Sequence, residues 1–160
     1  MDTSDVMNQR GRDSAQIDTP QQFLTMPGYV IRRLQQAYAA AWLRYVGPEL
    51  TGPQFAVMFA IKLHPGVEQG SLARAAALDR STMAGVVKRL EGRNLVLRIQ
   101  PSEDGRKRLL YLTDDGAELF RLVNSRARQL DALLREGIDP VASRQYLNER
   151  ADLWESLTID

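Results

Sequence analysis

The chain has no cysteine and only one histidine, His64, among its 160 residues. The absence of cysteine excludes a disulfide framework and a thiol-based redox sensor. A zinc or other transition-metal site would need carboxylates in place of the thiolates and imidazoles that usually bind such ions. We therefore expect no metal and no other cofactor.

Long apolar runs and catalytic sequence patterns are also missing. No run approaches the ~20 apolar residues of a membrane span, and the N-terminus is polar, unlike a signal peptide. There is no GxGxxG, no Walker pattern, and no Ser/His/Asp set that His64, in its His-Pro-Gly turn, would complete. We expect a cytoplasmic protein that spans no membrane and is not an enzyme.

The most informative stretch runs from Gly70 to Thr113. Two helical apolar patterns are separated by polar residues at 79–81, where short side-chain oxygens can accept hydrogen bonds from the first turn of a second helix. Four apolar residues of that second helix share one face: Met83, Val86, Val87 and Leu90. The pattern predicts a helix-turn-helix.

The opposite face of the second helix suits a DNA groove. Its residues are small near the N-terminus, where backbone must approach base edges, and cationic further along, where phosphates lie. They are Ser81, Thr82, Ala84, Gly85, Lys88 and Arg89.

After Leu95 the apolar residues recur at every second position, which predicts a two-stranded hairpin around a loop at 101–106. Arg106, Lys107 and Arg108 lie at or just beyond its tip. A basic tip beside a helix-turn-helix can enter an adjacent minor groove, whose negative potential attracts cations. The alternative is an ordinary hairpin whose charged side chains are solvated. Residues 80–108 carry eight Lys/Arg against three Asp/Glu, whereas residues 109–160 carry six against ten, which favours a phosphate-binding segment.

Three ordered motifs in this stretch resemble the multiple antibiotic resistance regulator (MarR) family of winged-helix repressors. They are LDRSTMAGVVKRLEGRNLVLR, then Asp-Gly-Arg at 104–106, then LTDDG at 112–116. The family pattern has a recognition helix ending in RLExxGLV, a wing with D-x-R, and LT-x-x-G at the start of a long helix. The resemblance covers roughly residues 25–155. Asn94 stands where the family usually has Gly, and Asn is the next-best residue for a left-handed turn after a helix.

The helices outside the helix-turn-helix need a partner. Residues 29–46 are apolar over more than half of a helical circumference. The helix predicted from Asp114 has a coiled-coil-like seam at steps of three and four: Phe120, Val123, Ala127, Leu130 and Leu134. A further amphipathic helix covers 141–157. We infer that the N- and C-terminal helices of two subunits interlock into a symmetric homodimer, as in the family that the chain resembles.

The predicted fold is mainly α with a small β wing. Residues 1–19 are polar and without a period, and we expect a flexible arm there. Residues 49–113 form the predicted winged helix-turn-helix lobe, and residues 20–48 and 114–160 form the helical dimerisation lobe.

Two recognition helices of a dimer would read half-sites of a pseudo-palindromic operator in double-stranded DNA. We expect Ser81, Thr82 and Gly85 to approach base edges. Lys88 and Arg89 would bind phosphates or a guanine, and Arg106 would enter the minor groove. Ser71 would either cap its helix or touch a phosphate. The full predicted set is Ser71, Arg80, Ser81, Thr82, Gly85, Lys88, Arg89, Arg106 and Lys107.

A small-molecule effector is implied by the segment PGYVIRRLQQ, which is similar to the subset of the family that senses aromatic carboxylates or related catabolites. There the first Arg of the pair contacts the ligand, so the resemblance assigns Arg32. The alternative is that Arg32 and Arg33 reach solvent or pair with acids. Tyr38 would pack the ligand ring, and further pocket candidates are Met58, Phe59 and Asn124. Met58 and Phe59 are otherwise plain core, and Asn124 otherwise faces solvent.

These inferences together predict a dimeric, ligand-responsive transcriptional regulator. Repression of an operator, released by a small aromatic carboxylate or related catabolite, is the function that the resemblance implies. The alternative is a winged-helix adaptor that binds protein and has no sequence-specific affinity for DNA.

Overall fold

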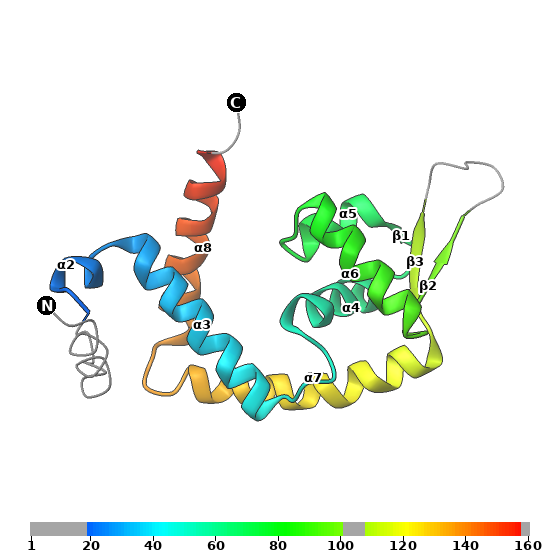
Figure 1. Cartoon of the computed structure of the whole chain (residues 1–160), viewed down its shortest axis with the longest axis horizontal. Helices are drawn as coiled ribbons and strands as arrows, with labels where there is room; N and C mark the ends of the chain where they lie inside the picture. Colours follow the sequence, from blue (N-terminus) through cyan, green and yellow to red (C-terminus); the bar gives the residue numbers. More distant parts are fainter. Residues whose placement is uncertain (1–18, 101–107, 158–160) are drawn as a thin grey trace, which may run out of the picture. The chain divides into compact units, whose positions relative to one another are not determined.

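The structure is a computed structural model that describes residues 19–100 and 108–157. The chain divides into two units, Met1–Tyr38 and Ala39–Asp160. The elements in chain order (Figure 1) are α2 (Gln21–Leu24), α3 (Pro27–Tyr45), α4 (Gly52–Leu63), β1 (Val67–Glu68), α5 (Gln69–Ala75), α6 (Arg80–Gly92), β2 (Val96–Ile99), β3 (Leu109–Leu112), α7 (Asp114–Leu134) and α8 (Pro140–Ser156).

The first unit contains α2 and most of α3. Phe23 of α2 stacks on Tyr29 of α3, with ring centroids 5.8 Å apart. The apolar side chains along this part of α3 are exposed: Val30, Ile31, Leu34 and Tyr38. The broad apolar surface predicted for this helix is therefore present and is largely uncovered in the single chain.

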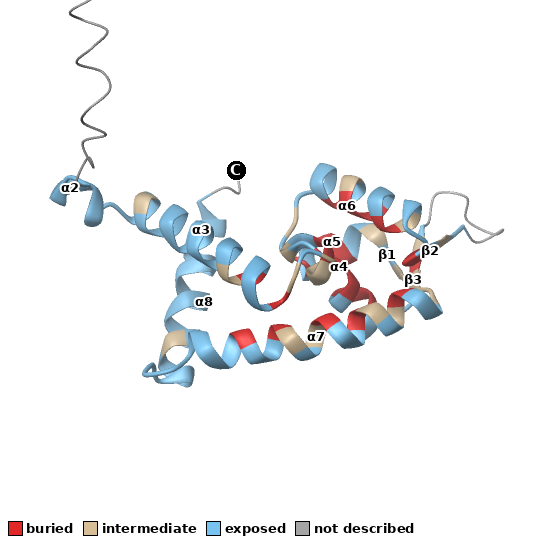
Figure 2. Ribbon diagram, turned by 60° about the horizontal axis from the view of Figure 1, so that its bottom comes forward, coloured by how far each residue is buried: buried red, intermediate tan, exposed pale blue. Residues whose placement is uncertain are grey.

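The second unit has one hydrophobic core, made by α4, α5, α6, the sheet and one side of α7. Figure 2 shows the buried residues gathered on these elements. The largest fully buried side chains include Leu50, Met58, Ile61, Leu72, Met83, Leu90, Leu110 and Leu130. The apolar face predicted for the second helix of the helix-turn-helix, Met83, Val86, Val87 and Leu90, is confirmed as the buried face of α6.

The wing is a three-stranded antiparallel sheet in the order β1-β3-β2. Val96 pairs with Leu112 and Ile99 with Leu109, while Val67 of β1 pairs with Leu110. The alternating pattern predicted two strands but not β1, because a strand of two residues is too short to show alternation.

Helix α7 begins at a tight junction with β2 and β3. Thr113 is its N-cap and accepts a hydrogen bond from the Gly116 backbone N–H at 3.0 Å. The Thr113 hydroxyl donates to the Asn94 carbonyl at 2.7 Å. Asn94 has φ +56°, which confirms the predicted left-handed turn after the recognition helix.

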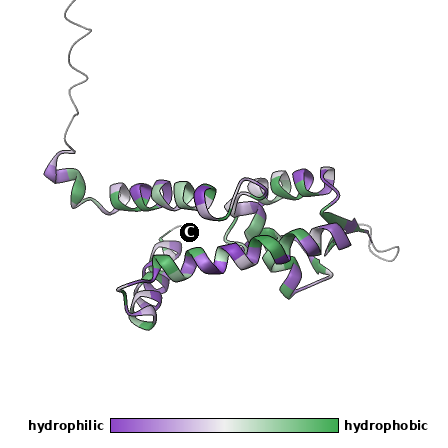
Figure 3. Ribbon diagram, turned by 90° about the horizontal axis from the view of Figure 1, so that it is seen from below, coloured by the Kyte–Doolittle hydropathy of each residue, from purple (hydrophilic) through white to green (hydrophobic). Residues whose placement is uncertain are grey.

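The seam predicted along α7 is covered by the chain itself over most of its length. Phe120, Val123, Ala127 and Leu130 are buried, and α7 packs against α4. Of the five seam residues, only Leu134 is exposed, at 45%. The predicted need for a partner helix is met over this part by α4 of the same chain. The spacing of a seam does not say which surface covers it. Figure 3 shows the alternating hydropathy along α7.

Helix α8 differs from α7 because none of its residues is buried. It carries large exposed apolar side chains at Val141, Tyr146, Leu147, Leu153 and Trp154. No helix in the described ranges is long and apolar enough to span a membrane.

Candidate nucleic-acid interface and effector residues

The helix-turn-helix is built from α5, a four-residue turn at 76–79, and α6. The turn is closed by a hydrogen bond from the Leu78 N–H to the Ala73 carbonyl at 2.9 Å. Ala77 adopts φ +52°, a left-handed conformation that bends the chain between the helices. Leu72 and Ala73 of α5 are buried with the inner face of α6, which fixes the two helices against each other.

The N-terminus of α6 is capped by Asp79. Its carboxylate accepts hydrogen bonds from the backbone N–H groups of Ser81 and Thr82, each at 2.9 Å. It also accepts from both hydroxyls, that of Ser81 at 2.6 Å and that of Thr82. The Ser81 and Thr82 hydrogen bonds hold the pKa of Asp79 well below its usual range, so this side chain stays ionised near neutral pH.

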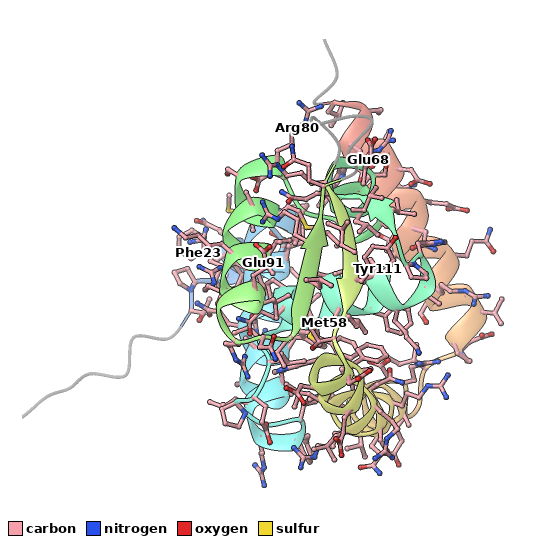
Figure 4. All side chains as sticks on the ribbon, turned by 90° about the vertical axis from the view of Figure 1, so that its right-hand side faces the viewer. Phe23, Met58, Glu68, Arg80, Glu91 and Tyr111 are labelled. Atoms are coloured by element: carbon pink, nitrogen blue, oxygen red, sulfur yellow. The ribbon has the colours of Figure 1, made fainter. Side chains whose placement is uncertain are left out.

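The outer face of α6 brings together most of the predicted DNA-contacting residues. Arg80, Ser81, Thr82, Lys88 and Arg89 are exposed, and Gly85 is half-buried. Arg80 stands at the first turn of the helix (Figure 4). The side opposite the core is therefore small and hydroxyl-bearing at its start and cationic further along, as a major-groove helix requires.

Ser71 lies on α5 and is exposed. The structure contradicts its predicted capping role, because α5 begins at Gln69 with Glu68 at the N-cap position. Ser71 is thus inside the first turn, and only its predicted phosphate contact is left as a hypothesis. The loop residues Arg106 and Lys107 lie outside the described residues.

An ion pair joins the wing to the recognition helix. The Arg98 guanidinium on β2 lies 2.6 Å from the Glu91 carboxylate on α6, and both side chains are half-buried. The position of Glu91 on the side of α6 facing the sheet is visible in Figure 4. This contact links the strand that leads into the wing loop to the helix predicted to enter the major groove.

A second polar junction centres on Glu49 in the loop before α4. Arg126 of α7 donates to the Glu49 carboxylate at 2.9 Å and to the Val46 carbonyl at 3.1 Å. Arg93, just after α6, donates to the Glu49 carbonyl at 2.8 Å. The hydrogen bond from Arg126 lowers the pKa of Glu49. This junction was not predicted from the sequence, since Arg126 and Glu49 are 77 positions apart and neither belongs to a motif.

Four aromatic rings of the second unit form a cluster between α4, α7 and the end of α3. Phe55 contacts Trp42, Phe59 and Phe120, with centroid separations of 5.2, 5.9 and 5.5 Å. Phe59 also meets Phe120 edge-on and is 40% exposed, so one edge of the cluster reaches the surface. The Trp42 indole N–H donates to the Leu50 carbonyl at 2.7 Å.

The predicted effector residues fall in different surroundings. Met58 (Figure 4) is fully buried in the core, in line with the alternative that this residue is plain core. Asn124 is half-buried on α7. Arg32 and Tyr38 belong to the first unit and are exposed, and in the described residues neither Arg32 nor Arg33 forms an ion pair. Contact of these residues with an effector stays a prediction.

Within 19–100 and 108–157, no three His, Asp or Glu side chains come together in an arrangement that would hold a metal ion.

Comparison with known sequences supports the interpretation of the helix-turn-helix and wing. The profile of the MarR family matches residues 50–107. The HTH-type transcriptional repressor NicR of Pseudomonas putida is 34% identical over 122 residues, which cover 75% of this chain and 77% of NicR. The transcriptional regulator HosA of Escherichia coli O157:H7 is 40% identical over 90 residues, which cover 56% of this chain and 66% of HosA. The chain thus spans slightly less than two thirds of the length of HosA.

Solved structures give the same result over more of the chain. The PcaV transcriptional regulator of Streptomyces coelicolor, in complex with its natural ligand, has a TM-score of 0.78 and 32% identity over 84% of this chain and 96% of PcaV. Bordetella bronchiseptica BpsR, whose DNA binding is regulated by 6-hydroxynicotinic acid, has a TM-score of 0.76 and 29% identity over 84% of this chain and 99% of BpsR. These relatives agree with the mainly helical fold, the small antiparallel wing and the recognition helix of this chain. The chain belongs to the MarR family.

Proposed function

We propose that this protein is a dimeric transcriptional repressor that leaves its operator when a small aromatic carboxylate binds. The observation that carries the proposal is the outer face of α6, which is exposed, hydroxyl-bearing at its start and cationic further along. Relatives named as transcriptional regulators and repressors support this function over a protein-binding adaptor. They point to regulation rather than catalysis. We propose a cytoplasmic location, because that is where a repressor meets its operator.

The proposed organisation follows from the exposed apolar surfaces. Residues 49–113 form the DNA-binding lobe, residues 20–48 and 114–160 the dimerisation lobe, and residues 1–19 an arm. The uncovered apolar side chains of α3 and α8 support burial between two subunits. Two copies of α6 related by a two-fold axis then read the half-sites of a pseudo-palindromic operator.

In the proposed complex, Ser81, Thr82 and Gly85 approach base edges in the major groove. Lys88 and Arg89 bind phosphates or a guanine, and Arg80 and Ser71 lie within reach of the backbone. Arg106 and Lys107 of the wing loop enter the adjacent minor groove. The Arg98–Glu91 ion pair supports a fixed angle between wing and recognition helix, so both elements contact DNA together.

The DNA-binding part is tested by the salt dependence of operator affinity. Each phosphate contact contributes about −0.9 to the slope of log K against log salt concentration. Lys88→Ala and Arg106→Ala should each weaken binding and reduce the steepness of this slope by about 1. Arg144→Ala, on the exposed surface of α8, is the matched control and should leave the slope unchanged. A shallow slope with no sequence preference in the unmutated protein would identify an adaptor instead.

The effector part rests on Arg32, whose guanidinium is exposed and unpaired with any acid of the described residues. A fork of N–H donors can hold a carboxylate by two parallel hydrogen bonds. Tyr38, Phe59, Met58 and Asn124 complete the proposed set. The regulation of BpsR by 6-hydroxynicotinic acid, an aromatic carboxylate, supports this ligand class. A coupling of about 1–3 kcal/mol between ligand and operator would give roughly 5–150-fold release.

The effector part is tested by thermal unfolding with a panel of aromatic and aliphatic carboxylates. A ligand at 100 times its Kd stabilises the folded protein by about 2.7 kcal/mol, which raises the unfolding midpoint visibly. Arg32→Ala should lose this shift, while Arg33→Ala keeps it. If Arg32→Ala retains full ligand affinity, its assignment to the effector is wrong; if no compound shifts the unmutated protein, the ligand class is wrong.

A further inference from the structure

The hydrogen bonds at the start of α6 fix where two hydroxyl protons point. The Asp79 carboxylate receives four hydrogen bonds, two from backbone N–H groups and two from side-chain hydroxyls. Oδ1 takes both N–H groups and the Ser81 hydroxyl, whereas Oδ2 takes the Thr82 hydroxyl. Each hydroxyl has one proton and two acceptor lone pairs. Both protons are therefore directed toward Asp79, and the lone pairs are left for other partners.

Asp79 remains in its accepting form under ordinary conditions. The same hydrogen bonds lower its pKa, so at neutral pH the carboxylate carries no proton to donate. A hydroxyl beside an ionised carboxylate gains a charge-assisted hydrogen bond by donating to it, which is stronger than a bond to a neutral partner. Ser81 and Thr82 are exposed, so their free lone pairs are open to the surroundings.

We propose that Asp79 is a positioning residue that sets the base preference of the recognition helix, by making the Ser81 and Thr82 hydroxyls acceptors. This inference rests on the proposed DNA-binding function. In the major groove only the N4 amine of cytosine and the N6 amine of adenine donate hydrogen bonds, while guanine O6 and N7 and thymine O4 accept. The bases that face these two hydroxyls are therefore adenine or cytosine.

The substitution Asp79→Asn separates this role from helix capping. Asn can keep Oδ1 toward the two backbone N–H groups, so the cap and the Ser81 contact persist. The amide nitrogen then replaces Oδ2 and donates to the Thr82 hydroxyl, whose own proton is released outward. The base preference opposite Thr82 should change to guanine or thymine, while the preference opposite Ser81 stays the same.

The experiment is selection of bound sequences from a library with randomised operator half-sites, followed by sequencing. Ser81→Ala and Thr82→Val identify the base that each hydroxyl faces, because the preference there is lost. In the unmutated protein we expect adenine or cytosine at both positions, favoured about 3- to 10-fold, the range of one net hydrogen bond. Asp139→Asn is the matched control. Asp139 caps α8 by the same pair of backbone contacts, and no hydroxyl of the described residues donates to its Oδ2.

Each outcome has a distinct meaning. A switch to guanine or thymine opposite Thr82 in Asp79→Asn alone supports the proposal. A preference for guanine or thymine opposite either hydroxyl in the unmutated protein would overturn it. An unchanged base preference in a folded Asp79→Asn would also overturn it. So would a base preference that Ser81→Ala and Thr82→Val leave unaffected. If Asp79→Asn does not fold, the base preferences of the unmutated protein and of the two hydroxyl variants still show whether the hydroxyls accept hydrogen bonds from adenine or cytosine. No enriched sequence from the unmutated protein would refute the proposed DNA-binding function itself.

Discussion

Gly116 of α7 lies directly against the backbone of Leu95, the residue before β2. A Cβ built on Gly116 would lie 1.9 Å from the Leu95 carbonyl oxygen. That distance is far inside van der Waals contact, and the neighbouring atom is backbone, so no side-chain rotation can relieve it. The glycine of the LTDDG motif is thus explained by close approach, and the threonine of the same motif by the cap and the bond to Asn94.

We predict that Gly116→Ala lowers the free energy of unfolding by about 1–3 kcal/mol, the range for overpacked sites. Urea unfolding measures this change. Gly92→Ala is the control, because a Cβ at Gly92 in α6 meets nothing within 4 Å. Its stability should be unchanged or higher by up to about 1 kcal/mol. Equal stability of Gly116→Ala and the unmutated protein would show that the junction with Leu95 is not tight.

At the scale of elements, the loop between α3 and α4 connects parts that are distant in sequence. Through Glu49 it is hydrogen-bonded to Arg126 in α7 and to Arg93 at the end of the recognition helix. The Trp42 indole adds a buried bond to Leu50 in the same loop. A short hydrogen-bonded path therefore runs from α7 through Glu49 to the end of α6.

The Glu49 contact makes an acid-sensitive contribution to stability. Its pKa is lowered from the ordinary value of 4.5 in the folded chain, mainly by Arg126, so the folded state favours the ionised form. The contribution is present above the unfolded pKa and is lost as the pH falls through the folded pKa. We predict that Glu49→Gln is less stable than the unmutated protein at neutral pH and that the difference shrinks below about pH 4.5.

Urea unfolding at a series of pH values tests this. Glu118→Gln, an exposed acid on α7 outside the junction, should show no such convergence with the unmutated protein. A difference for Glu49→Gln that stays constant across the acidic range would mean that the Arg126 contact does not favour the ionised carboxylate.

For the molecule as a whole, exposed apolar surface is the main indicator of assembly. Helix α8 has no buried residue, although it carries large apolar side chains. Leu147 is 60% exposed and Trp154 is 42% exposed. Burial of such side chains gains about 25 cal/mol per Å² of apolar surface. A second subunit of this chain supplies that burial in the proposed repressor.

We predict that Leu147→Glu shifts the protein from dimer to monomer, because it places a charge in the proposed subunit interface. Sedimentation velocity measures the assembly state. Operator affinity should fall by roughly 100-fold or more, since the second recognition helix no longer binds at high effective concentration. Asn148→Glu adds the same charge on an adjacent face of α8 and should remain dimeric. A dimeric Leu147→Glu would exclude α8 from the interface.

Local pattern predicted the parts of the fold whose partners lie close in sequence. The apolar face of α6, the left-handed Asn94 and the start of α7 at Asp114 all depend on residues within a few positions of one another, or on intrinsic conformational preference. The two-residue strand β1 and the start of α5 did not follow, because very short elements contain too few residues for a period.

The sequence by itself determined the helix-turn-helix, the wing and the family, because periodicity and the three ordered motifs are local. Only the tertiary structure decided that the chain's own α4 packs against the α7 seam, that Met58 is fully buried, and that Glu49 joins α6 and α7. It alone showed how Asp79 orients two hydroxyls. These features depend on distances between side chains, and helical spacing fixes only the face on which each side chain lies.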